Sequence, residues 1–156
     1  MTFSVPINDR YFEDYVIGDV HDLGNVIVDY DEMLDFSRRY DMQVFHVDPE
    51  GAKKTPFGGI IASGWFTIAL MMHIFIRDYM THVAGLASPG VDEVRWFKPV
   101  RAGDRLSVRV TVVSAVGSKS KPDRGIVNSK IEVFNQATEL VLSLICTNFI
   151  GRRSAG

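Results

Sequence analysis

The sequence predicts an α+β domain in which an antiparallel β-sheet curves around one long, buried helix. Residues 57–76 contain no formal charge, as expected of a helix that a sheet covers on most sides. The second half alternates apolar and polar residues, and short connections between the alternating stretches favour antiparallel pairing. A chain of 156 residues suits one domain, spanning 1–156, with a sizeable core.

The first half predicts a strand at 20–28, followed by a short amphipathic helix at 30–40. Asp29 is an N-cap candidate for that helix, with Glu32 three residues later as in a capping box. We expect residues 41–46 to form a loop.

A second helix start is expected at Asp48, because Pro49 follows at the first helical position. The long helix is expected from about Ile61 to Tyr79. Residues 57–76 are long enough to span a bilayer. Gly58, Gly59, Gly64 and the polar Ser63, Thr67 and His73 favour a buried helix instead.

The second half predicts a β-rich region. Strands are expected at 91–97, 106–112, 130–133 and 140–150, with a turn at 98–104. The stretch 140–150 is apolar on both faces, as expected of a central strand.

Composition excludes several classes of protein. The formal charge of −2 gives no reason to expect binding to nucleic acid or to an anionic membrane. A single cysteine, Cys146, excludes an internal disulfide and a cysteine-based metal site, and we expect no metal. Residues 1–15 show no secretory signal, so a cytoplasmic enzyme is expected.

Asp41 and His46 form the most informative feature, because they stand five residues apart just before a glycine-rich entry into the long helix. A carboxylate and an imidazole can together hold and activate a water molecule. Small residues at a helix start can admit a polarised carbonyl. The combination indicates an enzyme, although Asp41 alone could end the preceding helix and His46 could be a buried structural residue. Asp48 is interpreted as a cap, and His73 as a core or pocket-lining residue.

Four segments resemble the MaoC-like dehydratases, the hotdog-fold group that includes the (R)-specific enoyl-CoA hydratases. They are residues 11–14, 41–49, 57–64 and 99–104, in this order over nearly the whole chain. The resemblance implies a hotdog fold, a homodimer or higher homo-oligomer, and an acyl-CoA thioester substrate with no cofactor.

The resemblance also implies the chemistry and the site residues. Asp41 and His46 are expected to add water reversibly to a trans-2-enoyl-CoA, giving a 3-hydroxyacyl-CoA. Backbone N–H groups at the start of the long helix are expected to bind the thioester oxygen. The residues expected to contact substrate are Ala62, Ser63, Gly64, Trp65 and Trp96.

Two features leave the substrate open. Characterised hydratases of the group read Asp-x-Asn-Pro-x-His, whereas Gln43 and Val44 replace the Asn and Pro here, and Ser63 stands where a histidine is common. The basic residues Lys119, Lys121 and Arg124 are either a solvated loop or a contact for the phosphates of coenzyme A.

Bulky side chains near the helix, including Trp65 and Trp96, either belong to the core or line the acyl channel. If they line the channel, they favour short or branched acyl chains of roughly four to eight carbons. The rival functions are a hotdog acyl-CoA thioesterase and a non-catalytic acyl-binding subunit.

Overall fold

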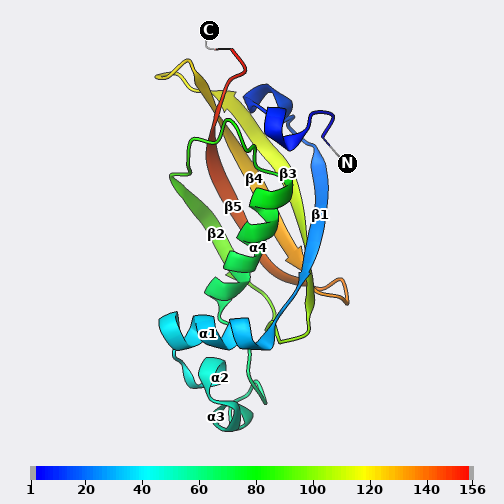
Figure 1. The fold of residues 1–156 in the computed structure, drawn as a ribbon, viewed down its shortest axis with the longest axis vertical. Coiled ribbons are helices and arrows are strands. Elements are labelled where there is room, and N and C mark those ends of the chain that lie inside the picture. Colours follow the sequence, from blue (N-terminus) through cyan, green and yellow to red (C-terminus); the bar gives the residue numbers. More distant parts are fainter. Residues whose placement is uncertain (1–2, 155–156) are drawn as a thin grey trace.

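Five strands form one antiparallel sheet in the computed structural model, which describes residues 3–154 (Figure 1). The strands are β1 (Val20–Ile27), β2 (Gly90–Trp96), β3 (Arg105–Gly117), β4 (Arg124–Phe134) and β5 (Leu140–Gly151). Their order across the sheet is β1-β3-β4-β5-β2. The predicted α+β hotdog architecture is confirmed, and β3 and β4 run well beyond the expected segments.

The sheet curves because irregularities interrupt its register in several strands. They fall between Asp22 and Asn25 of β1, between Asp92 and Arg95 of β2, and between Val112 and Ser114 of β3. Each such irregularity bends a strand and increases its twist. The bent strands partly enclose the long helix α4 (Gly64–Asp78), which lies across the concave face in Figure 1.

Helix α4 begins at Gly64, three residues later than expected. The backbone N–H of Ile61 donates to Phe45 O, and that of Ala62 donates to Val100 O. These long-range bonds hold residues 61 and 62 in a non-helical segment that precedes α4. Ser63 then caps it, accepting from the N–H of Trp65 at 3.3 Å.

One face of α4 packs against the sheet. Phe66, Leu70, Ile74 and Phe75 are buried among inward-facing residues of the strands. Burying a side chain of this size contributes about 1.5–3 kcal/mol. The opposite face is uncovered in the single chain, where Trp65, Met72 and Ile76 are exposed.

Three short helices precede α4: α1 (Tyr30–Tyr40), α2 (Val44–Val47) and α3 (Pro49–Lys53). The two predicted caps are confirmed, since Asp29 accepts from the N–H of Glu32 and Asp48 from that of Gly51. The prediction of a loop at 41–46 is wrong for residues 44–46. Val44 begins α2 there, so His46 lies on a helix.

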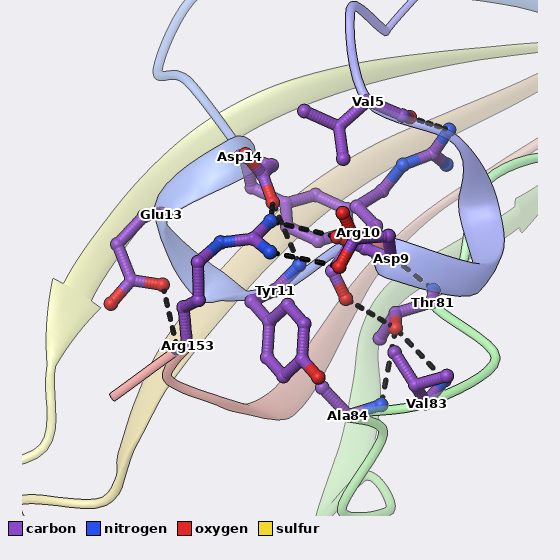
Figure 2. Close-up of polar contacts among 11 residues, drawn as sticks. Val5, Asp9, Arg10, Tyr11, Glu13, Asp14, Thr81, Val83, Ala84 and Arg153 are labelled. Carbon is purple, nitrogen blue, oxygen red and sulfur yellow. Dashed lines mark hydrogen bonds and ion pairs between the residues drawn. The ribbon is translucent and has the colours of Figure 1, made fainter. Parts of the chain in front are cut away.

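The N-terminal segment is bound by Arg153, which follows β5. It contains two 3₁₀ turns, η1 (Ile7–Asp9) and η2 (Phe12–Asp14). Figure 2 shows Arg153 reaching the carboxylates of Asp9 at 2.8 Å and Asp14 at 2.9 Å. Buried Arg10 donates to the carbonyl oxygens of Val5 and Tyr79. These contacts lie at the end of the sheet opposite α1–α3, whereas the candidate site lies at the α1–α3 end.

Within residues 3–154 no helix is both long and apolar enough to cross a bilayer. Nor do the residues in that range include a cluster of three or more histidine, cysteine or acidic side chains able to hold a metal ion.

Candidate active site

A cavity of about 420 Å³ opens at the N-terminal end of α4. The first turn of α4, the segment around α2 and the chain that follows β2 form its walls. Its polar side chains come from Asp41, Gln43, His46, Thr67 and Lys98, and its aromatic ones from Phe57, Trp65, Trp96 and Phe97.

Asp41 and His46 lie together in this cavity. The backbone N–H of Asp41 ends α1 by donating to Ser37 O, while its side chain turns toward His46. The Oδ2 atom of Asp41 is 3.3 Å from Nε2 of His46. Their side chains are only 17% and 7% exposed, so the pair is shielded from bulk water yet lines the cavity.

The orientation of the imidazole follows from its second nitrogen. Nδ1 of His46 lies 2.9 Å from Ile61 O. A carbonyl oxygen can only accept, so Nδ1 carries a proton and Nε2 of the neutral ring has a free lone pair. That lone pair and Asp41 Oδ2 are then neighbouring acceptors. A water molecule can donate one hydrogen to each of them.

Two further contacts hold the carboxylate of Asp41. Gln43 Nε2 donates to Oδ1 at 2.8 Å, and the hydroxyl of Ser63 donates to Oδ2 at 2.7 Å. Partial burial acts to raise the pKa of Asp41. The hydrogen bonds from Gln43 and Ser63, with the positive charge of a protonated His46, outweigh it, and the pKa lies below its usual value. Asp41 is therefore ionised at neutral pH.

The start of α4 supplies donors beside this pair. N–H groups in the first turn of a helix have no acceptor within the helix, and the helix dipole favours negative charge there. Gly64, the first helical residue, lines the cavity together with Ala62. Ser63 is fully buried and meets the cavity only through its bond to Asp41.

Trp65 and Trp96 form one wall of the cavity. Their rings meet edge to face, with centroids 5.5 Å apart, and both remain exposed on their outer side. A Cβ on Gly64 would lie 2.5 Å from the indole of Trp96. Only glycine at position 64 therefore lets this ring rest on the helix start.

The predicted basic contact lies elsewhere in the chain. Lys119 and Lys121 belong to the connection between β3 and β4, at the end of the sheet opposite α2 and α3 (Figure 1). Arg124 pairs with Asp123 at 2.8 Å. These three residues do not line the cavity of their own chain, and their contact with coenzyme A stays a prediction.

Lys98 and His73 lie at two different grooves of the molecule. Lys98 lines the cavity and forms an ion pair with Glu139, a placement that the sequence did not predict. The turn at 98–104 was its only signal. His73 is exposed on α4 rather than in the core, and it borders a second groove between α1 and α4.

Comparison with known proteins adds family evidence to this geometry. Residues 17–133 match the MaoC like domain family. The chain is 30% identical over 125 residues to the uncharacterised protein YdeM of Bacillus subtilis, covering 80% of this chain and 86% of that one. It is 33% identical over 98 residues to 3-hydroxyacyl-thioester dehydratase Z of Mycobacterium tuberculosis, covering 62% of this chain and 65% of that one.

Solved structures agree with the family match. A MaoC-like dehydratase from Rhodospirillum rubrum superposes with a TM-score of 0.85 at 33% identity, covering 93% of this chain and 99% of that one. The (R)-hydratase of A. caviae shares the fold at 20% identity with a TM-score of 0.67, covering 85% of this chain and 95% of that one. With a family match over most of the chain and a hotdog sheet around α4, this protein belongs to the MaoC-like dehydratase family.

Proposed function

We propose that this protein is a hydratase/dehydratase that adds water reversibly to a trans-2-enoyl-CoA, giving a 3-hydroxyacyl-CoA. The observation that carries the proposal is the convergence of Asp41 Oδ2 and His46 Nε2 in a cavity beside the start of α4. The identity to a 3-hydroxyacyl-thioester dehydratase supports the same reaction class.

The water is held between the two acceptors. Ionised Asp41 orients the water, and His46 Nε2 takes one proton from the water as the water oxygen bonds to C3. The electrons of the double bond move toward the thioester oxygen, which becomes an enolate beside the N–H of Gly64. A proton from the same pair then reaches C2, so one water has added across the double bond. The reverse sequence is dehydration.

A panel of enoyl-CoA substrates of varied chain length and branching tests this reaction. Hydration consumes the enoyl absorbance and leaves no free thiol, whereas hydrolysis of the thioester releases coenzyme A thiol. We expect enoyl loss without thiol release. Thiol release would support the thioesterase alternative, and binding without turnover would support the acyl-binding subunit.

We further propose that the protein acts as a homodimer in the cytoplasm. Strand β2 is an edge strand with Val91 and Trp96 exposed, and the uncovered face of α4 is also apolar. Exposed edges and apolar faces of this kind are usually covered by a partner. A second copy of the chain would cover both.

A further inference from the structure

We propose that the indole N–H of Trp96 is a second donor to the enolate oxygen, acting beside the backbone N–H of Gly64. This inference rests on the proposed hydration reaction. It assigns a catalytic contact to a side chain at the end of β2, outside both α4 and the Asp41–His46 segment.

The distance between the two donors fits one shared oxygen. Nε1 of Trp96 lies 2.5 Å from the position that a Cβ on Gly64 would take. Backbone N and Cβ of one residue are about 2.5 Å apart, so the two nitrogens lie within about 5 Å of each other. Two N–H donors, each about 2.9 Å from a common oxygen, can be up to about 5.8 Å apart. The separation of the two nitrogens therefore allows one thioester oxygen to accept from both.

The chemistry of the indole suits this role. Its N–H donates and never accepts, and it does not titrate in the working range of pH. No group among residues 3–154 accepts a hydrogen bond from Trp96 Nε1. The donor is thus available to a substrate that enters the cavity, which Trp96 lines.

The ring is held in place before substrate arrives. Trp96 pairs with Leu142 of β5, and the next residue, Phe97, donates its N–H to Val141 O at 2.9 Å. Trp65 supports the indole edge to face. A donor already fixed where negative charge develops stabilises the transition state without reorganisation.

Trp96→Phe tests the proposal, because phenylalanine keeps an aromatic ring but removes the N–H. Trp65→Phe is the comparison variant, since it removes an indole N–H from the neighbouring ring of the same wall. We expect Trp96→Phe to lower kcat by about 10- to 1,000-fold, as loss of an oxyanion donor does, with KM changed only a few-fold. The loss is uniform across pH. Trp65→Phe should lower kcat by less than Trp96→Phe, because it only weakens the support of the Trp96 ring.

A second variant separates the N–H from the shape of the ring. Replacing Trp96 by 3-benzothienylalanine substitutes sulfur for N–H in a bicycle of the same outline, and it should lose kcat as Trp96→Phe does. A normal kcat in this variant, or equal losses in Trp96→Phe and Trp65→Phe, would overturn the inference about Trp96. The proposed function would still stand if the unsubstituted protein hydrates an enoyl-CoA. An unsubstituted protein that hydrates no enoyl-CoA overturns both.

Discussion

Replacing Asp41 by asparagine removes the charge of the proposed water-binding pair with almost no change of shape. The carboxylate accepts from Ser63 and Gln43 and faces His46 at 3.3 Å. An amide fits the same space, because the Ser63 hydroxyl can rotate and the Gln43 amide can turn to accept. The fold should therefore survive, while the ability to orient the water for deprotonation by His46 is lost.

We expect Asp41→Asn to lower kcat by about two to four orders of magnitude, the range for a positioned acid or base, or about 2.7–5.4 kcal/mol of barrier. His46→Ala should fall in the same range. Initial rates of enoyl loss on the best substrate measure the effect, and thermal unfolding checks the fold.

Asp48→Asn is the matched control. Asp48 lies seven residues along the chain and caps α3 through the N–H of Gly51 at 3.1 Å, a role that asparagine fills equally well. It should change neither kcat nor stability appreciably. A folded Asp41→Asn protein that retains kcat within about threefold would show that Asp41 is only the end of α1.

Four further predictions follow from the same geometry. Ser63→Ala removes a donor to Asp41 and raises the pKa of that carboxyl toward its usual 3.8, so the acid loss of kcat due to Asp41 moves to higher pH in a pH–rate profile. The native depressed pKa stabilises the fold above pH 4, and that stabilisation is lost as pH falls through the folded pKa. Gly64→Ala places a methyl 2.5 Å from the indole of Trp96 and displaces the ring, lowering kcat at least about tenfold with a changed tryptophan fluorescence; an unchanged spectrum would contradict the contact. Specificity should peak at roughly four to eight acyl carbons, and a kcat/KM that rises beyond about ten carbons would mean that the aromatic wall does not limit chain length. Light scattering should find a homodimer, and a stable, active monomer at micromolar concentration would refute it.

The architecture was predictable because its signals are local and repeated. Alternation at 106–112 and the uncharged run at 57–76 identified β3 and α4, and the caps at Asp29 and Asp48 follow from short-range hydrogen bonds. The start of α4 was not predictable. It depends on the bond from Ala62 N–H to Val100 O, which joins segments far apart in the chain.

The sequence predicted the pair of Asp41 and His46 but not the side chains that contact them. The spacing of Asp41 and His46 identified two side chains that the structure brings to 3.3 Å. Their catalytic roles stay predictions. Gln43 was noted only as a departure from the family motif, and its bond to Asp41 became visible only in three dimensions. Charge alone does not show at which end of a sheet a loop lies, so the sequence left Lys119 and Lys121 as either a solvated loop or a contact for coenzyme A, and that contact stays a prediction.

The hydrogen bonds of Arg153 to the N-terminal segment have a practical consequence for tagging and immobilising the protein. Its bonds to Asp9 and Asp14 bring the two outer segments of the described chain together (Figure 2). They meet at the end of the sheet opposite α2 and α3 (Figure 1). An affinity tag or surface linker attached at either side of this junction emerges away from the cavity mouth. Immobilised protein therefore keeps its substrate entrance open to solution.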